Sequence, residues 1–518
     1  MKLVKMLALI CTAGLFSSLG YATSASVYHR YLPDKIITLD PTKSIERYSQ
    51  SVILQIYDPL FKTEDGITPL PHIAESFSYD ADTRTYMIDL RKDVHFHDDV
   101  QLTAEDVIFT IRRMCESKDA NVTLLSLIEG CKTKGNFGVR KMNPFRITIQ
   151  LTDNFPPFIS LLASPHFMIL PAKLHGRAEE EFFRQPVGTG PFRIASIDAH
   201  AVVLTGNRKY FRGPPDIGQL VYHTEPPERI YAMLRDSAID DIFPLPAPER
   251  YPDRYVPVSV NQASSLFLAF RPSVKPYASK AFREAIRAAI DNRRVLGGLP
   301  PKSGIIPAHG IVPWGAIGFD STIPESVFSP TAVQSLLRRA GYKRSDDVPP
   351  LIIHSALKDD LERVVPPALK ASLESVGFKV RIIQQSLPDL MKDIDRGDVG
   401  MMLINPTMAS VDTYRFLELW RANFPHPSLR ISDGTFDAIL DDALKTSDRI
   451  ERSRLYKTAN RILHTESHAH HIGHVISCTS LRAKGWRLPG MNFLGPFFYS
   501  MYDATYDPKK TDSVNQGI

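Results

Sequence analysis

The spacing of apolar residues divides the chain into two regions with different predicted secondary structure. Residues 27–270 contain many segments that alternate apolar and polar positions, such as 85–90, and this alternation is typical of half-buried strands. Beyond this region, helical and strand patterns follow each other in turn. A helix is expected to begin at Ser279, and strands are expected at 351–354 and 399–404. The second region therefore predicts βαβ units in a separate α/β domain.

Two local motifs in the first region predict where a helix begins and where the chain makes a sharp turn. Thr103 and Asp106 have the spacing of a capping box ahead of an apolar stripe, so a helix is expected to begin there. Gly188 and Gly190 lie in the segment Val-Gly-Thr-Gly-Pro-Phe, where they would permit positive φ in a sharp turn. A phosphate cradle would need a lysine-containing loop or the dinucleotide-binding spacing, and this segment has neither.

The first residues carry the pattern of a secretory signal. Lys2 and Lys5 precede an apolar run at 6–19, and small residues follow at 20–25. This order predicts a cleaved signal peptide over residues 1–25, so the mature protein is expected to act outside the cytoplasm.

Two kinds of membrane anchor are the alternatives to a cleaved signal. A transmembrane helix needs about 20 apolar residues, and the first apolar run is shorter. A lipid anchor needs a cysteine near the end of the run, after a small residue, but Cys11 lies in its middle and follows Ile10. We therefore expect a freely diffusing protein.

Composition narrows the class of protein without identifying it. The 518 residues are 43% apolar and 23% charged, as in an ordinary globular protein, and this length suggests two or three domains. The formal net charge of +5 is mild, and the basic residues are scattered among acidic ones. A nucleic-acid-binding protein would gather basic charge on one face, so no nucleic-acid partner is expected.

The spacing of Cys115 and Cys131 allows two interpretations. Cys115 and Cys131 could close a loop of about 15 residues in an oxidising compartment, which the chain-entropy relation values at about 3 kcal/mol. Spacing alone does not establish the geometry that a disulfide needs, so the pair could also remain reduced. Cys478 is then expected to be a buried thiol.

Several short motifs occur in one order along the chain, at 57–61 (Tyr-Asp-Pro-Leu-Phe), 71–77 (Pro-His-Ile-Ala-Glu-Ser-Phe), 91–98 (Arg-Lys-Asp-Val-His-Phe-His-Asp), 102–107 (Leu-Thr-Ala-Glu-Asp-Val), 187–193, 207–213 and 281–290. Taken together in this order, they resemble the large extracellular solute-binding proteins that serve peptide and nickel ABC importers. The resemblance covers residues 27–486.

The resemblance implies an α/β fold of the periplasmic binding protein type, with two lobes, a small inserted domain and a hinge between the lobes. The first lobe would be assembled from separate segments, and the second would be the α/β region. The implied segments are 26–62, 186–268 and 487–518 for the first lobe, 63–185 for the inserted domain and 269–486 for the second lobe.

The resemblance also implies a function. Such a protein captures a peptide or similar small solute in the periplasm and delivers it to permease subunits of an ABC importer in the inner membrane. It would act as a monomer, without catalysis and without a cofactor. The sequence agrees in having no Gly-x-Ser-x-Gly elbow, no Cys-x-x-Cys and no Cys/His zinc spacing.

Three residues become ligand-binding candidates through the resemblance. In peptide-binding members, an aspartate after a strand holds the ligand ammonium, and Asp412 matches that place in a segment that also includes Asn405. The family usually has a tryptophan and then a glycine directly before the aspartate, whereas Val411 precedes Asp412 here. This difference leaves open whether Asp412 contacts the ligand or caps a helix. Lys358, after the strand at 351–354, could hold a ligand carboxylate or be a surface lysine.

Arg271 follows the apolar strand at 266–270, where the family usually has asparagine. An arginine there could bind a ligand carboxylate through two hydrogen bonds, or it could form a salt bridge between the lobes.

A cluster of histidines between His464 and His474 suggests the alternative function of an exported haem or nickel-complex carrier with the same fold. His464 and His468 have i, i+4 spacing but lack the glutamate position of a metalloprotease motif. On a regular strand, His470 and His474 would share a face and could bind a metal ion. Ordinary buried or surface histidines are the other interpretation.

Overall fold

The computed structural model describes residues 26–32, 35–44, 46–63, 69–117, 125–131, 136–155, 158–242, 250–300, 303–408, 412–424, 426–446, 448–488 and 499–507. The predicted signal peptide at 1–25, with Cys11, lies outside these residues, as does the side chain of Cys478.

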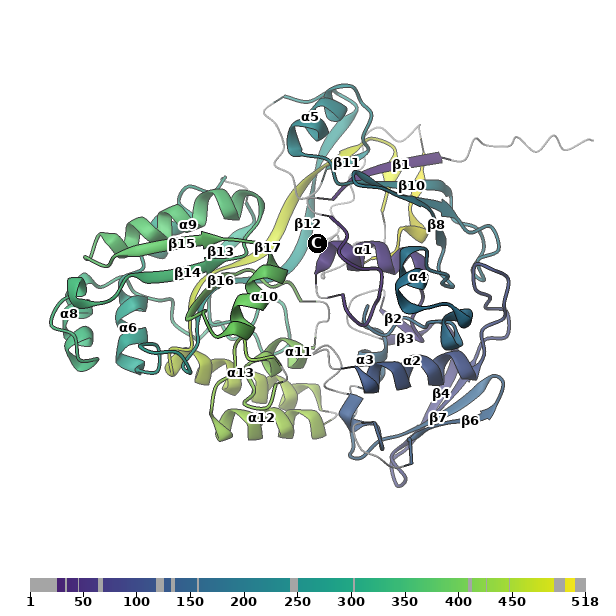
Figure 1. Cartoon of the computed structure of the whole chain (residues 1–518), viewed down its shortest axis with the longest axis horizontal. Helices are drawn as coiled ribbons and strands as arrows, with labels where there is room; N and C mark the ends of the chain where they lie inside the picture. Colours follow the sequence, from purple (N-terminus) through teal and green to yellow (C-terminus); the bar gives the residue numbers. More distant parts are fainter. Residues whose placement is uncertain are drawn as a thin grey trace, which may run out of the picture.

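One large sheet runs through the whole molecule (Figure 1). Its strands lie in the order β15-β14-β16-β12-β17-β11-β1-β10-β9-β8, and β13 pairs with β17 beside this path. The bounds are β1 (Ser26–Tyr31), β8 (Phe192–Ile197), β9 (Ala201–Gly206), β10 (Ile217–His223), β11 (Asp241–Ile242), β12 (Tyr255–Phe270), β13 (Ile305–Pro307), β14 (Leu351–Ser355), β15 (Val380–Gln384), β16 (Met401–Ile404) and β17 (Ala469–Ala483).

The long strands β12 and β17 connect two lobes. They pair antiparallel from Tyr255 opposite Ala483 to Ala269 opposite Ala469. The first-lobe strand β11 joins one end of this ribbon, whereas β16 and β13 join the other end. Leu266 already packs in the apolar core of the second lobe. The passage between the lobes therefore lies inside β12, a few residues before the expected boundary at 268, because a strand can cross between lobes without a loop.

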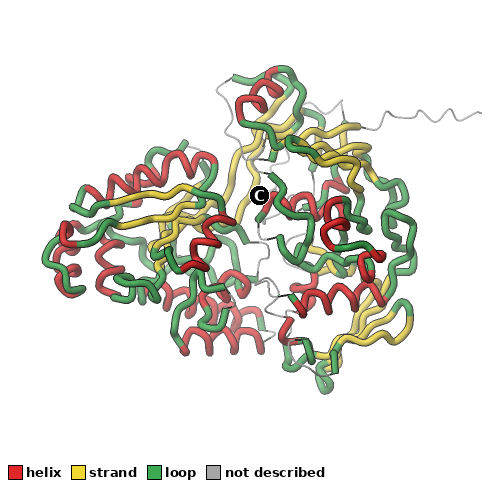
Figure 2. The backbone as a smooth tube through the Cα atoms, viewed as in Figure 1, coloured by secondary structure: helices red, strands yellow, loops and turns green. Residues whose placement is uncertain are grey.

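The second lobe has the α/β arrangement that its sequence predicts. Strands β14, β15 and β16 are parallel and are connected by helices. Helices cover both faces of these strands (Figure 2). The bounds are α6 (Lys280–Ala288), α7 (Asn292–Leu296), α8 (Pro330–Arg339), α9 (Asp359–Glu374), α10 (Leu387–Arg396), α11 (Tyr414–Leu417), α12 (Gly434–Lys445) and α13 (Arg449–Thr465).

The inserted domain is a small four-stranded sheet with helices on one face. Its strands lie in the order β4-β5-β7-β6, and the predicted capping box is present, with Asp106 Oδ2 accepting a hydrogen bond from the Thr103 backbone N–H at 2.7 Å. The bounds are β4 (Ala74–Asp80), β5 (Thr85–Leu90), β6 (Val139–Asn143), β7 (Arg146–Gln150), α2 (Ala104–Glu116) and α3 (Phe158–Leu162). The short strands β2 (Phe61–Thr63) and β3 (Pro69–Pro71) join it to the first lobe.

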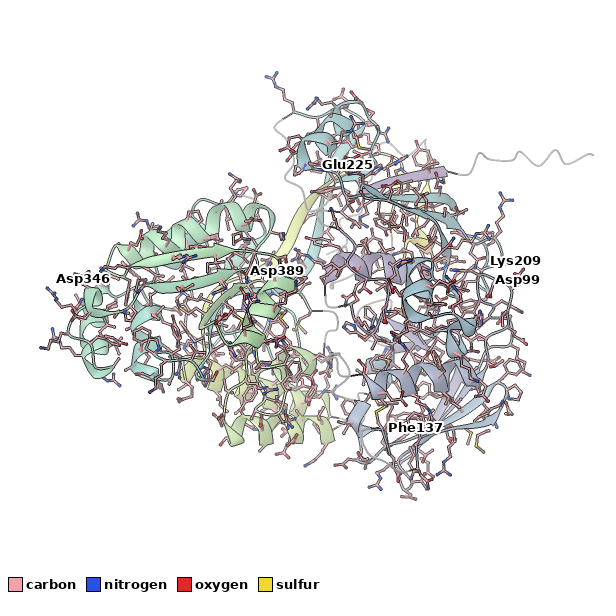
Figure 3. The ribbon with its side chains drawn as sticks, viewed as in Figure 1. Asp99, Phe137, Lys209, Glu225, Asp346 and Asp389 are labelled. Carbon is pink, nitrogen blue, oxygen red and sulfur yellow. A yellow bond between two sulfur atoms is a disulfide. The ribbon has the colours of Figure 1, made fainter. Side chains whose placement is uncertain are left out.

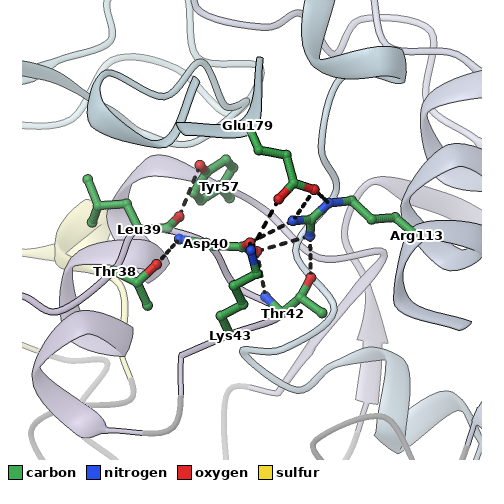
Figure 4. Close-up of polar contacts among 8 residues, drawn as sticks. All are labelled: Thr38, Leu39, Asp40, Thr42, Lys43, Tyr57, Arg113 and Glu179. Atoms are coloured by element: carbon green, nitrogen blue, oxygen red, sulfur yellow. Dashed lines mark hydrogen bonds and ion pairs between the residues drawn. The ribbon is translucent and has the colours of Figure 1, made fainter. Parts of the chain in front are cut away.

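A buried ion pair fastens the inserted domain to the first lobe (Figure 4). Arg113 of α2 donates from Nη2 to Asp40 Oδ2 at 2.6 Å and from Nη1 to Thr42 Oγ1 at 2.7 Å. It also contacts Glu179 of α4 (Glu179–Arg184) at 3.0 Å. A second tie, Lys209 to Asp99 at 2.7 Å, lies on the side of the first lobe that is turned away from the second (Figure 3).

The two glycines of the 187–192 turn are required by close packing. Neither has positive φ, which corrects the expectation from the sequence. Both lie against the last turn of α1 (Arg47–Ile56), where a Cβ on Gly188 would be 2.0 Å from the Ile56 carbonyl oxygen. The Gly190 N–H donates to that same oxygen at 2.8 Å. Any side chain here would push α1 away from the turn.

Cys115 and Cys131 form a disulfide that closes a loop across a sequence separation of 16 residues, with a Cα–Cα distance of 5.1 Å. We expect replacement of both cysteines by serine to lower the free energy of unfolding by about 3 kcal/mol, because the reduced chain gains loop entropy when unfolded. Urea denaturation of the parent and the double variant measures this difference. Reductant should destabilise the parent only, and equal sensitivity of both proteins would contradict the prediction.

Candidate functional site

The carboxyl ends of three parallel strands meet at the edge of the second lobe that is turned toward the first. Because β14, β15 and β16 are parallel, their last residues lie at one edge of the sheet. Antiparallel β12 fixes which edge this is. Ile404 pairs with Phe267, and Thr407 pairs with Ser264, where β12 arrives from the first lobe. In open α/β sheets, ligands bind beyond the carboxyl ends of the strands.

Amide and hydroxyl groups occupy this edge. Ser264 Oγ lies 2.7 Å from Thr407 Oγ1 and accepts a hydrogen bond from Gln262 Nε2 at 2.7 Å. Gln385 follows β15, and its side chain hydrogen-bonds His354 of β14. Asn405 Oδ1 follows β16 and is buried with no hydrogen-bond partner among the described residues. Such atoms cost free energy until a ligand or water satisfies them.

Two of the sequence candidates lie at this edge. Asn405 directly follows β16, and Lys358 is the half-buried residue before the first turn of α9. Ser355 of β14 pairs with both Gln384 of β15 and Leu403 of β16. Gln385 is therefore level with Ile404, and Asn405 projects to the opposite face of the sheet from Gln385.

Arg271 lies at the opposite edge of the same strands. Its backbone N–H donates to the Gly400 carbonyl at 3.0 Å, just before β16 begins. Nη1 donates to the carbonyl oxygen of Val399 at 2.9 Å, and burial lowers the pKa of the guanidinium. These contacts fasten the connection between α10 and β16 to the end of β12.

Asp412 is near the site, and its carboxylate is engaged inside the second lobe. Oδ1 accepts hydrogen bonds from the Tyr414 backbone N–H at 3.0 Å and from the Tyr456 hydroxyl at 2.8 Å. Oδ2 lies 3.2 Å from Arg452 Nε. The carboxylate therefore links helix α11 with helix α13. Burial and this neighbouring charge raise the pKa of the Tyr456 hydroxyl.

Residues of the first lobe and the inserted domain approach α11. His166 is buried beside Gln50 of α1, and burial together with the charge of Arg415 lowers the pKa of His166 to about 3. One continuous cluster of buried apolar side chains includes Leu162 of α3 and Leu417 of α11. The apolar core thus continues from the inserted domain into the second lobe.

Glu418 is the most unusual acid of this region. Its carboxylate is 1% exposed and lies 2.5 Å from Arg415 Nη1. Burial outweighs the charges of Arg415 and Arg421 and raises the pKa of Glu418 to about 7. The sequence did not indicate this residue or His166, because a single Glu or His in an apolar segment has no spacing signal.

The histidine candidates for a metal site lie on opposite faces of β17. A register shift places His474 opposite Ser265 and His470 opposite Leu268. Because these partners are three positions apart, an odd number, the two histidines point to different sides, which corrects the expectation that they share a face. His470 Nε2 lies 2.7 Å from Asn292 Oδ1, and His474 Nδ1 lies 2.9 Å from Ser265 Oγ.

The remaining histidines of the cluster are held as neutral groups. Burial first, and the charges of Arg283 and Arg287 second, lower the pKa values of His464 and His468 to about 4. Among the described residues, no group of three or more His, Cys, Asp or Glu side chains is placed to hold a metal ion.

Residues 68–426 match the family model of the bacterial extracellular solute-binding proteins, family 5. This match covers more than half of the chain. The chain belongs to this family. None of the helices in the described part of this solute-binding protein is long and apolar enough to cross a membrane.

Relatives of this solute-binding protein are named for different ligands. A dipeptide-binding protein of Pseudomonas aeruginosa is 24% identical over 79% of this chain and 82% of its own. Heme-binding protein A of Haemophilus influenzae is 24% identical over 88% of this chain and 87% of its own. The periplasmic binding protein DppA of Helicobacter pylori, solved with the peptide STSA, has a TM-score of 0.80 at 20% identity, covering 93% of this chain and 98% of its own.

The raised pKa of Glu418 predicts a pH-dependent stability. An unfolded chain ionises this carboxyl near pH 4.5, whereas the folded protein keeps the proton up to about pH 7. The stability from this group is therefore fully present below about pH 4.5 and is lost as the pH rises through about 7. We expect Glu418→Gln to exceed the parent's free energy of unfolding by less than about 1 kcal/mol at pH 5 and by about 3 kcal/mol at pH 8.

Urea denaturation at both pH values measures this difference. Glu451→Gln is the matched control, because Glu451 forms an exposed pair with Arg454 that lowers the pKa of its carboxyl, so the folded protein keeps it ionised at both pH values. A parent and a Glu418→Gln variant with the same pH profile would contradict the prediction.

Proposed function

We propose that this protein is the solute-capturing component of an ABC importer. It binds a peptide or similar small solute between its lobes in the periplasm and delivers it to permease subunits in the inner membrane. The observation that carries the proposal is the edge of β14, β15 and β16, where Asn405 Oδ1 is buried without a partner among the described residues. Family membership supports capture of a solute by this edge.

The crossing strands suggest how capture would work. A ligand bound at the edge would contact the second lobe first and then the first-lobe elements that approach α11. Contacts with both lobes are made only when the lobes are together, so ligand binding would favour that arrangement. Release would reverse the movement at the permease.

Two of the candidate residues are proposed to contact the ligand. Asn405 supplies an amide at the edge, and Lys358 supplies a positive charge for a ligand carboxylate. Asp412 and Arg271 are proposed to support the second lobe, since both are engaged by neighbouring elements. We further propose that the protein acts as a monomer and that it is not an enzyme, because capture and delivery require no change in the solute.

A ligand panel tests the proposed function. Purified mature protein is heated with peptide libraries, with haem and with nickel chelates, and its melting temperature is recorded. A true ligand at about 100 times its dissociation constant should stabilise the protein by about 2.7 kcal/mol. Stabilisation by peptides supports the proposal. Stabilisation by haem or nickel chelates and by no peptide would instead support the carrier function suggested by the histidine cluster.

Asn405→Leu is expected to weaken binding of the best ligand about tenfold, or about 1.4 kcal/mol, because the ligand loses one hydrogen bond. The ligand-free protein should keep or gain stability, since an unpartnered polar atom is removed. Isothermal titration calorimetry measures the affinity, and thermal unfolding measures the stability.

Asn460→Leu is the matched control for this substitution. Asn460 Oδ1 accepts a hydrogen bond from the Ile311 backbone N–H at 2.8 Å, so leucine there should destabilise the free protein. If Asn405→Leu destabilises the free protein as much as Asn460→Leu and leaves affinity unchanged, Asn405 has a structural role only.

A further inference from the structure

We infer that His166 makes solute capture depend on pH, because the lobes can come together fully only around a neutral imidazole. The inference rests on the proposed function, since it concerns the same closure of the lobes, and it adds a regulatory device that capture alone does not require. The observation behind it is a buried histidine at the contact between the inserted domain and the second lobe.

His166 lies where three parts of the fold meet. It follows α3 of the inserted domain and lies beside Gln50 of α1 in the first lobe, with 3.5 Å between the two Nε2 atoms. Arg415 of α11 supplies the third side, because its charge acts on the imidazole from the second lobe. Helices α3 and α11 approach each other here, and their buried leucines belong to one apolar cluster (Figure 1). As a result, His166 is only 9% exposed.

The hydrogen bonds of the imidazole fit its neutral form. The ring hydrogen-bonds the backbone of Pro41, and since proline has no N–H, a ring nitrogen is the donor. Nδ1 of His166 is buried and has no hydrogen-bond partner among the described residues. A neutral imidazole has one N–H, whereas a protonated imidazole has two. Protonation would therefore add a buried N–H that lacks an acceptor, which is unfavourable.

The charges around the ring also oppose its protonation. Burial first, and the positive charge of Arg415 second, lower the pKa of His166 to about 3. On the first-lobe side, Asp40 is engaged by Arg113 at 2.6 Å and by Lys43 at 3.7 Å. An imidazolium would thus face the Arg415 guanidinium across a poorly solvated interface.

Two glutamates complete the charges on the elements packed around His166. Glu46 accepts hydrogen bonds from the backbone N–H groups of Tyr48 and Ser49 at the start of α1. Glu418 of α11 contacts Arg415, and burial raises the pKa of its carboxyl to about 7. If opening of the lobes exposed Glu418, its proton would favour closure and oppose the effect of His166. The experiment must therefore remove Glu418.

Opening of the lobes would return His166 to water. Once α11 no longer covers the ring, the pKa of His166 would approach its ordinary value of about 6.5. The open arrangement then binds the proton more tightly than the closed one, so acid favours opening. The contribution of His166 to closure is fully present above about pH 6.5 and is lost as the pH falls below it. At pH 5 the closing equilibrium is weakened about 30-fold.

The affinity for a solute at two pH values tests the inference. The probe is the peptide that stabilises the parent most in the ligand panel, and calorimetry gives its dissociation constant at pH 7.5 and at pH 5. The measurements use Glu418→Gln, which removes the other group of this region that titrates over this range. We expect affinity to fall about 30-fold at pH 5 in Glu418→Gln, and by less than about threefold when His166→Gln is added.

His468→Gln in the same background is the matched control. His468 is 8% exposed, and burial with the charge of Arg283 lowers its pKa to about 4, but it lies in the second lobe between α13 and β17. This substitution should leave the pH dependence of affinity in place. An equal fall in affinity with and without His166 would overturn the inference and leave the proposed function intact.

A ligand-free titration decides the inference if no peptide binds, in which case the proposed peptide function has itself failed. The His166 ring is followed by NMR in the parent and in Arg415→Met, with His166→Gln identifying its signal. We expect the pKa of His166 to lie below the ordinary value in the parent and closer to it in Arg415→Met, because the second lobe then loses its positive charge. A His166 that titrates near its ordinary pKa in both proteins would overturn the inference, since the second lobe would not shield the ring.

Discussion

The antiparallel pairing of β12 with β17 is the interaction on which the rest of the structure depends. It carries one sheet through both lobes, so the lobes are joined by backbone hydrogen bonds instead of by loops. It also sets the direction of β16, because β16 pairs with the second-lobe half of β12. Since β14 and β15 run parallel to β16, this one pairing places their carboxyl ends beside the passage between the lobes.

Contacts between the lobes combine apolar burial with charged residues that contact each other within the second lobe. The apolar cluster shared by α3 and α11 favours contact of the inserted domain with the second lobe. Arg415 and Glu418 lie in the same region and are paired with each other. A contact made within one lobe adds little attraction toward the other, so closure would depend on the solute. If the lobes closed on each other readily without solute, solute binding could no longer shift the equilibrium between open and closed arrangements.

The sequence predicted the helices and strands well but did not predict how the strands pair in register. Ser279 caps α6 as expected, and the parallel strands of the second lobe follow from their apolar runs. The opposite orientation of His470 and His474 could not be predicted, because a register shift in β12–β17 leaves no trace in apolar periodicity. The surroundings of Arg271 and Glu418 could not be predicted from the sequence either. They depend on how segments that are distant in the sequence pack together in the folded protein.

The family relationship and the ligand are encoded by different residues. The recognisable motifs include residues that pack the first lobe, such as the glycines on α1, and residues that join it to the inserted domain, such as Asp58 with His72. These contacts are needed whatever solute is bound. This explains how a relative named for dipeptides and a relative named for haem can both be 24% identical to this chain. Ligand choice would instead rest on a few side chains at the strand ends. Because Asp412 is paired with Arg452 within the second lobe, a carboxylate at the expected sequence position does not by itself provide a site for a positive charge.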